Sequence, residues 1–103
     1  MIKEWEENDG LGREDGKTLV DFYATWCGPC RVMSRIIEKY SEEVPELRIV
    51  KIDVDKNPEL AEKFSVQSIP TLIFLDGENV KDRSVGVISE SELREKAARL
   101  LTE

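Results

Sequence analysis

The sequence has no histidine and only two cysteines among its 103 residues. Tetrahedral zinc needs four ligands from cysteine, histidine or carboxylate side chains, so a zinc site is an unfavourable interpretation. Basic residues are also in deficit, with 15 Lys and Arg against 22 Asp and Glu and a net charge of −7. We expect no nucleic-acid or anionic membrane partner, because phosphate binding requires clustered Lys and Arg.

Long hydrophobic runs are missing as well. The longest clean run is residues 72–75, far short of the roughly 20 apolar residues that span a membrane. Residues 1–7 have neither the basic start nor the apolar stretch of a signal peptide. We therefore expect a cytoplasmic protein, with the mature part of an exported protein as the less favoured alternative. In a reducing compartment, a close cysteine pair is more often catalytic or metal-binding than structural.

The remaining composition fits one globular domain over residues 1–103, with a modest core. Apolar patterning predicts the order strand, helix, strand, helix, strand, strand, helix. The expected strands are residues 18–24, 48–54, 71–75 and 80–85, and the helices begin at the cysteines, at Asn57-Pro58 and at a capping box over 89–92. The first helix should bury an apolar stripe at helical spacing: Val32, Met33, Ile36, Ile37 and Tyr40.

Residues 1–17 form a short, atypical N-terminal segment with little pattern. Ile2 and Trp5 are spaced to anchor a short helix on the core. Residues 9–16 are predicted to be a loop, because they contain three glycines.

The two cysteines, Cys27 and Cys30, stand directly after the first of these strands. At this spacing on the first turn of a helix they lie side by side and can form and break a disulfide with little backbone movement. Cys27 is the expected nucleophile, because a helix N-terminus stabilises a thiolate, and its place on a turn after Trp26 should leave it partly exposed. Cys30 should be more buried and should release the substrate by attacking the mixed disulfide. A purely structural bridge, giving about 2 kcal/mol for so short a loop, is the alternative.

Asp21 is the polar exception in an apolar strand. A buried carboxylate is unfavourable unless it is paired or protonated. The functional interpretation is an acid of raised pKa that passes a proton to or from Cys30. The alternative is an aspartate at a strand edge that reaches solvent.

Residues 20–30, Val-Asp-Phe-Tyr-Ala-Thr-Trp-Cys-Gly-Pro-Cys, together with Ser68-Ile69-Pro70-Thr71, resemble the thioredoxin family. The resemblance covers the chain from residue 17 onward and implies the α/β thioredoxin fold, a three-layer α/β/α arrangement around a mixed sheet of four or five strands. It supports the proton-relay role of Asp21 and implies a cis peptide bond before Pro70. It also implies that Lys51 approaches and tunes Asp21, with a solvated lysine as the alternative. A substrate-binding surface is implied at Trp26, Gly28, Pro29, Val54, Ile69, Val85 and Gly86.

The sequence departs from this family pattern in three places. Arg35 stands where the active-site helix usually has a kinking proline, which predicts a straighter helix. Tyr23 stands where tryptophan is usual. The short N-terminal segment leaves little room for the usual first strand and helix. We therefore expect the first strand to be missing or very short, and the outer edge of strand 48–54 to be covered by residues 1–7 or by a second chain.

The resemblance implies a thiol-disulfide oxidoreductase, a general protein disulfide reductant that acts as a monomer on oxidised protein substrates. No bound cofactor is needed, because the sulfurs of Cys27 and Cys30 are the redox group. Thioredoxin reductase, a flavoprotein, would restore the dithiol. The Gly28-Pro29 pair between the cysteines matches the reducing members of the family. The alternatives are a binding module in a larger complex and a dedicated reductant of one enzyme.

Overall fold

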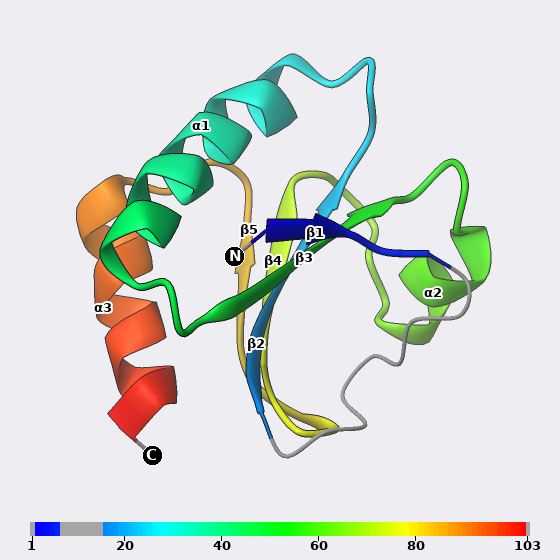
Figure 1. The fold of residues 1–103 in the computed structure, drawn as a ribbon. Helices are drawn as coiled ribbons and strands as arrows, with labels where there is room; N and C mark the ends of the chain where they lie inside the picture. Colours follow the sequence, from blue (N-terminus) through cyan, green and yellow to red (C-terminus); the bar gives the residue numbers. More distant parts are fainter. Residues whose placement is uncertain (1, 7–15, 103) are drawn as a thin grey trace.

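A computed structural model of the chain describes residues 2–6 and 16–102 (Figure 1). The loop predicted over residues 9–16 lies outside these ranges, apart from Gly16. From the second strand onward, the order of elements is the one that the sequence pattern predicts. The described strands are β1 (Ile2–Glu4), β2 (Lys17–Tyr23), β3 (Arg48–Asp53), β4 (Thr71–Asp76) and β5 (Asn79–Val85). The described helices are α1 (Gly28–Glu43), α2 (Pro58–Lys63) and α3 (Glu90–Thr102).

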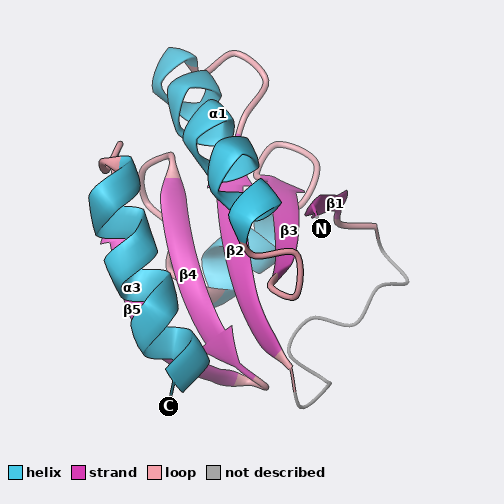
Figure 2. Ribbon diagram, turned by 60° about the vertical axis from the view of Figure 1, so that its left-hand side comes forward, coloured by secondary structure: helices cyan, strands magenta, loops and turns pink. Residues whose placement is uncertain are grey.

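The strands form one mixed sheet in the order β1-β3-β2-β4-β5. The strands β1, β3 and β2 are parallel to one another, whereas β4 is antiparallel to β2 and β5 is antiparallel to β4. Helices α1 and α3 cover one face of the sheet, and α2 covers the other, as Figure 1 and Figure 2 show. The predicted three-layer α/β/α arrangement is therefore confirmed, with five strands.

Strand β1 corrects the expectations for the N-terminal segment. It is a strand of 3 residues that pairs parallel with β3, with Ile2 opposite Ile49 and Glu4 opposite Lys51. The first strand is therefore present but very short, and it covers the outer edge of β3. The predicted helix anchored by Ile2 and Trp5 is wrong. In an extended chain, alternate positions send Ile2 to the core on the α1 face and Trp5 to the core on the α2 face.

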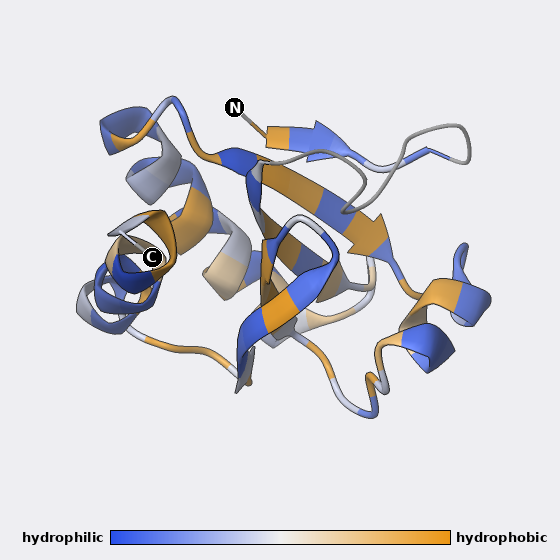
Figure 3. Ribbon diagram, turned by 90° about the horizontal axis from the view of Figure 1, so that it is seen from below, coloured by the Kyte–Doolittle hydropathy of each residue, from blue (hydrophilic) through white to orange (hydrophobic). Residues whose placement is uncertain are grey.

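Two apolar cores fill the spaces between the sheet and its helices, one on each face. Figure 3 shows hydrophobic colour on the strands at the centre of the molecule and polar colour mainly on the outer surfaces of the helices. The core on the α1 and α3 face includes Leu19, Ile49, Leu72, Met33, Ile37, Tyr40, Leu93 and Ala97. The core on the α2 face includes Val20, Phe22, Ile52 and Ile73, with Leu60 and Phe64 partly buried against it.

The buried stripe of α1 is narrower than the sequence predicts. Met33, Ile37 and Tyr40 are buried and Ile36 is half-buried, but Val32 is 45% exposed. One residue along a helix is a rotation of about 100°, so Val32 lies on the flank of the helix beside Met33 and not toward the sheet. An apolar residue adjacent to a helical stripe is therefore not always part of the core.

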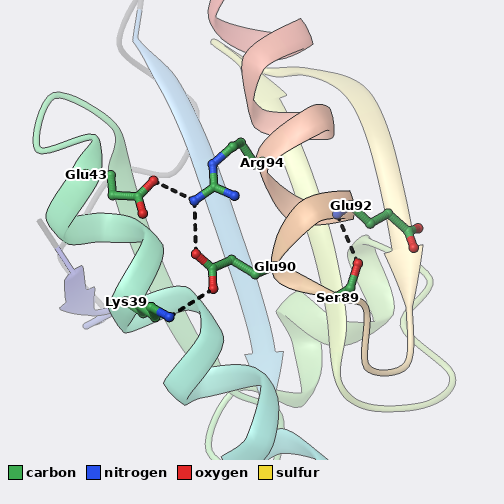
Figure 4. Close-up of polar contacts among 6 residues, drawn as sticks. All are labelled: Lys39, Glu43, Ser89, Glu90, Glu92 and Arg94. Carbon is green, nitrogen blue, oxygen red and sulfur yellow. Dashed lines mark hydrogen bonds and ion pairs between the residues drawn. The ribbon is translucent and has the colours of Figure 1, made fainter.

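Helix α3 begins after Ser89, whose Oγ accepts a hydrogen bond from the Glu92 N–H at 3.1 Å, which is one of the two bonds of the predicted capping box. Arg94 binds Glu43 of α1 at 2.6 Å and Glu90 of its own helix at 2.9 Å. Ion pairs thus link the two helices of this layer through Lys39, Glu43, Glu90 and Arg94 (Figure 4).

Candidate active site

Cys27 lies at the turn between β2 and α1. It is the N-cap of α1, with an extended backbone (φ −90°, ψ 110°), and Pro29 stands in the first turn, where its missing N–H removes no helical hydrogen bond. The Cys27 Sγ accepts a hydrogen bond from the Cys30 N–H at 3.1 Å. The sulfur thus occupies the place where a serine or aspartate oxygen usually caps a helix. A helix N-terminus favours negative charge at this atom, as a nucleophilic thiolate requires.

Cys27 and Cys30 are joined by a disulfide, with Cα atoms 5.2 Å apart, within the range that a bridge needs. The exposed fraction is 4% for Cys27 and 2% for Cys30. The prediction that Cys27 is partly exposed is therefore wrong for the disulfide form, although Cys30 is the more buried of the two. Side chains from several elements cover the pair, because Ala24, Tyr23, Val54 and Ile69 pack against it.

Pro70 begins the approach to β4 beside this cluster. The Ile69–Pro70 peptide bond is cis, as the family resemblance implies. The Pro70 side chain is buried, and its carbonyl oxygen accepts a hydrogen bond from the Gly86 N–H at 2.8 Å. This bond brings the end of β5 next to the start of β4, so Ile69, Pro70 and Gly86 lie together.

Asp21 is buried in the middle of the sheet, on β2. Its exposed fraction is 1%, and neither carboxylate oxygen has a hydrogen-bond partner among the described residues. Burial raises the pKa of Asp21 to about 7, while the charge of Lys51 lowers it and the charge of Glu4 raises it. The alternative of a strand-edge aspartate that reaches solvent is therefore wrong. The proton-relay role stays a prediction.

Lys51 is the neighbour of Asp21 on β3, in register with it. Its Nζ donates a hydrogen bond to Ser34 Oγ of α1 at 2.8 Å and lies 4.5 Å from the centre of the Tyr23 ring. The Tyr23 hydroxyl in turn donates to Glu4 Oε1 of β1 at 2.7 Å. Lys51 is thus held by contacts that sequence reasoning missed, because Ser34 and Glu4 join it only through helix packing and strand pairing.

Of the implied substrate-binding surface, Gly28 and Pro29 lie between the cysteines in the chain, and Val54 and Ile69 pack against the pair. Trp26 is 67% exposed, and its Nε1 donates a hydrogen bond to Asp55 Oδ2 at 2.8 Å. Val85 is 58% exposed at the end of β5. The other members are exposed or half-buried in the same region: Gly28, Pro29, Val54, Ile69 and Gly86. Val87, which is 46% exposed and follows Gly86, was not predicted as part of this surface.

Across residues 2–6 and 16–102, no group of three or more His, Cys, Asp or Glu side chains is placed to hold a metal ion. The site consists of two sulfurs in one helical turn, with Asp21 buried in the strand that leads to them.

Comparisons with known proteins give the class of the molecule. The family model described as Thioredoxin matches residues 3–99. A thioredoxin of Chlamydia trachomatis is 44% identical over 89 residues, which cover 85% of this chain and 86% of the relative. The X-ray structure of Fasciola hepatica thioredoxin superposes with a TM-score of 0.78 at 40% identity, covering 84% of this chain and 83% of that one.

A second similar structure comes from work on the thiol resolving mechanism in yeast mitochondrial 1-Cys peroxiredoxin via glutathione and thioredoxin systems. It superposes with a TM-score of 0.79 at 30% identity, covering 85% of this chain and 82% of that chain. The fold and the site are those of a thiol-disulfide oxidoreductase with a redox-active cysteine pair, which reduces protein disulfides and needs no bound cofactor. The chain belongs to the thioredoxin family.

Proposed function

We propose that the chain is a general, monomeric cytoplasmic reductant of protein disulfides, in which Cys27 attacks the substrate and Cys30 releases it. The observation that carries this proposal is the Cys27 Sγ at the N-cap of α1, where it accepts the Cys30 N–H. No helix within the described ranges is both long and apolar enough to cross a membrane. A flavoprotein reductase of thioredoxin would supply the electrons.

The reaction proceeds in two exchange steps. The Cys27 thiolate attacks one sulfur of the substrate disulfide, a mixed disulfide forms, and the other substrate sulfur leaves as a thiolate that takes up a proton. Cys30 then gives its proton to Asp21 and attacks the Cys27 sulfur. The substrate leaves as a second thiolate, and two electrons have passed from the chain to the substrate.

Asp21 suits the role of proton acceptor for Cys30. Its pKa of about 7 lies near neutral pH, where an acid or base exchanges protons most effectively. Replacing Asp21 by asparagine keeps the shape of the side chain and removes the carboxyl group that titrates. Asp21→Asn should therefore slow disulfide exchange by about 10-fold or more and flatten its dependence on pH between about pH 6 and pH 9. An unchanged rate throughout this range would contradict the relay.

Substrate binding rests on the apolar surface around the cysteines. An extended substrate segment would lie over Trp26 and Val85, which are exposed, and would hydrogen-bond the backbone beside Pro70. Gly86 lets the backbone of the partner approach closely, because it has no side chain. Weak apolar contacts of this kind suit a protein that serves many substrates.

The test is the precipitation of insulin in dithiothreitol. The unmodified protein should accelerate precipitation, and Cys27→Ser should not. Cys30→Ser, reduced and then freed of dithiothreitol before insulin is added, should still attack once and accumulate as a mixed disulfide with the insulin chain, which mass spectrometry detects. If the unmodified protein is no faster than Cys27→Ser, the proposed function is wrong.

A reductant dedicated to one peroxidase is the second candidate, favoured by the similarity to the chain from the yeast peroxiredoxin work. Cys30→Ser separates the two functions, because it traps each substrate that Cys27 attacks. Many trapped proteins support the general reductant, and a single trapped peroxidase supports the dedicated one. Cys27→Ser/Cys30→Ser is the matched control, since it keeps the fold and cannot trap anything.

A further inference from the structure

A row of alternating charges crosses the sheet on the face that α1 covers. Strand pairing places Glu4 of β1 opposite Lys51 of β3, and Lys51 opposite Asp21 of β2. On the other side of Asp21, the row continues with Leu72 of β4, an apolar core residue. Asp21 therefore has one cationic neighbour in the row, and that cation has a second carboxylate on its far side.

The Lys51 ammonium is held by groups other than Asp21. On one side α1 supplies Ser34, whose Oγ accepts its hydrogen bond at 2.8 Å. The Lys51 Nζ also lies over the ring of Tyr23, 4.5 Å from the ring centre. Glu4 holds that ring in place, because its carboxylate accepts a hydrogen bond from the Tyr23 hydroxyl at 2.7 Å. Both oxygens of Asp21 remain without a hydrogen-bond partner among the described residues. The position of the ammonium is thus set by Ser34 of α1 and by the Tyr23 ring of β2, which Glu4 of β1 holds in place.

We propose that Ser34 and Glu4 are positioning residues of the redox reaction, because they fix where the Lys51 ammonium lies relative to Asp21. The inference rests on the proposed function, in which Asp21 exchanges a proton with Cys30. Ser34 acts through Lys51, whereas Glu4 acts through the Tyr23 ring beside Lys51 and also through its own charge on Asp21. The effect of each should therefore appear in the proton affinity of Asp21, and the effect of Ser34 should depend on the lysine.

The direction in which each substitution should change the pKa of Asp21 follows from the groups on this face of the sheet. Lys51 of β3, Glu4 of β1 and Tyr23 of β2 are the titratable groups beside Asp21, and Cys30 of α1 is the group with which the proposed function couples it. Strand β4 and helix α3 contribute apolar side chains to this face. Lys51 lowers the pKa of Asp21 and Glu4 raises it. Removing the charge of Glu4 should therefore lower this pKa.

Removing the Ser34 hydroxyl should have the opposite effect. Lys51 then loses its hydrogen bond to α1. Its neighbour on β1, Glu4, is an exposed carboxylate at the outer end of the row. The ammonium should move toward Glu4, because a solvated ion pair needs no desolvation of the carboxylate. Its attraction on Asp21 weakens, and the pKa of Asp21 rises.

The experiment follows the Asp21 carboxyl carbon by ¹³C NMR in the dithiol form from about pH 4 to about pH 10, with Asp21→Asn to assign the signal. Glu4→Gln should lower the titration midpoint and Ser34→Ala should raise it, each by about half a pH unit. Ser34→Thr retains the hydroxyl and should keep the original midpoint. The pH profile of insulin reduction should move in the same direction as the NMR midpoint.

Three controls separate positioning from a general effect of substitution. Ser41→Ala makes the same change two turns further along α1, at a half-buried serine whose hydroxyl bonds the Glu38 carbonyl of its own helix. Glu78→Gln removes one negative charge in the exposed turn between β4 and β5. Neither should move the midpoint. In a Lys51→Met background, Ser34→Ala should have no further effect.

An unmoved Asp21 midpoint in Ser34→Ala, or a shift that persists in the Lys51→Met background, would overturn the inference. A shift in Ser41→Ala equal to that in Ser34→Ala would overturn it as well. The NMR titration of Asp21 can be measured in the folded protein even if the protein does not reduce a substrate. Absence of insulin reduction by the unmodified protein therefore counts against the proposed function, whereas an unmoved midpoint in an active protein counts against this inference alone.

Discussion

Asp21 destabilises the fold at neutral pH, because its carboxylate is buried without a hydrogen-bond partner among the described residues. Its pKa is raised from 3.8 to about 7 by burial, against the attraction of Lys51. Between these values the folded chain holds a proton that the unfolded chain has released, so the free energy of unfolding falls as the pH rises. Above about pH 7 the loss of unfolding free energy caused by Asp21 is complete, and its upper limit is of the order of 4 kcal/mol.

Asp21→Asn should therefore stabilise the protein, and the gain should grow with pH. In urea unfolding, the free energy of the variant relative to the unmodified chain should increase from about pH 4 to about pH 8 and then stay constant. A variant that is less stable than the unmodified chain at pH 8 would contradict the raised pKa.

Asp82 provides a control, because its pKa is shifted in the opposite direction to that of Asp21. Burial pushes its pKa up, but the hydrogen bonds from Lys96 and from the Arg83 N–H, together with the charges of Lys96 and Arg99, outweigh burial and leave the pKa below its usual value. In the folded state Asp82 therefore loses its proton at a lower pH than in the unfolded state. The resulting stabilisation is fully present above the pKa of the unfolded state and is lost as the pH falls through the pKa of the folded state. Asp82→Asn should lose stability relative to the unmodified chain at neutral pH and lose less in acid.

Gly86 and Gly28 form a matched pair at the site. A methyl group added at either position meets no other atom within 4 Å, but Gly86 has φ +88° and Gly28 has no such backbone strain. Gly86→Ala should lower the free energy of unfolding by about 1–2 kcal/mol, because an L side chain disfavours that conformation. Gly28→Ala should raise it by about 0.5–1 kcal/mol, since it starts α1. Equal effects in urea unfolding would show that the two methyl groups act through packing and not through φ.

At the residue scale, the sequence identified the groups whose chemistry is unusual in their setting. A carboxylate in an apolar strand and two thiols in one turn are visible without coordinates, and the resemblance supplied the isomer of the Ile69–Pro70 bond. The sequence could not show the burial of Cys27, because that burial depends on Val54 and Ile69 from distant segments of the chain. Nor could it show the partners of Lys51, because a serine on α1 and a glutamate on β1 look like ordinary surface residues.

At the scale of elements, α1 and α3 are joined by a charged cluster as well as by their apolar core. Arg94 reaches Glu43 of the other helix and Glu90 of its own, whereas Arg99 forms an ion pair with Glu95 of its own helix at 3.3 Å. Arg94→Met should therefore lower the melting temperature more than Arg99→Met (Figure 4). The difference should vanish at high salt, because exposed ion pairs are screened. A difference that persists in about 1 M salt would assign the effect to packing of the Arg94 side chain, which lies over the Tyr40 ring.

Strand β1 shows the limit of pattern reasoning for a short element. Three residues cannot display a period of two, so the segment offered no strand signal, and the spacing of Ile2 and Trp5 favoured a helix instead. The partner strand decides the outcome, because the edge of β3 offers unpaired backbone groups and Trp5 donates its N–H to the Lys51 carbonyl at 2.8 Å.

Removing residues 1–6 should expose this edge. The free energy of unfolding should fall by about 1–3 kcal/mol, since Ile2 and Trp5 lose their partial burial. Amide hydrogen exchange should accelerate along β3, and sedimentation should detect association at high protein concentration, because an open strand edge pairs with other chains. Exchange along β5, on the opposite edge of the sheet, is the internal control. Unchanged exchange along β3 would mean that β1 does not protect it.

At the scale of the whole molecule, the redox state of one four-residue turn should change the stability of the entire chain. The Cys27–Cys30 disulfide closes a very short loop, which restricts the unfolded state by about 2 kcal/mol in the chain-entropy account. The two cores lie mostly outside this turn, so both redox forms should bury nearly the same surface and unfold with the same dependence on urea. Oxidation should therefore shift the midpoint and leave the slope unchanged.

Urea unfolding of both forms tests this prediction together with the expectation that residues 1–103 make one domain. A single domain unfolds in one cooperative transition that fluorescence and circular dichroism report at the same midpoint. Cys27→Ser/Cys30→Ser should give the same midpoint with and without reductant, because it has no bond to break. Two separate transitions would contradict one domain. A reduced form as stable as the oxidised form would mean that reduction brings a compensating gain in the folded state, and the Cys27 thiolate at the N-terminus of α1 is the group placed to provide it.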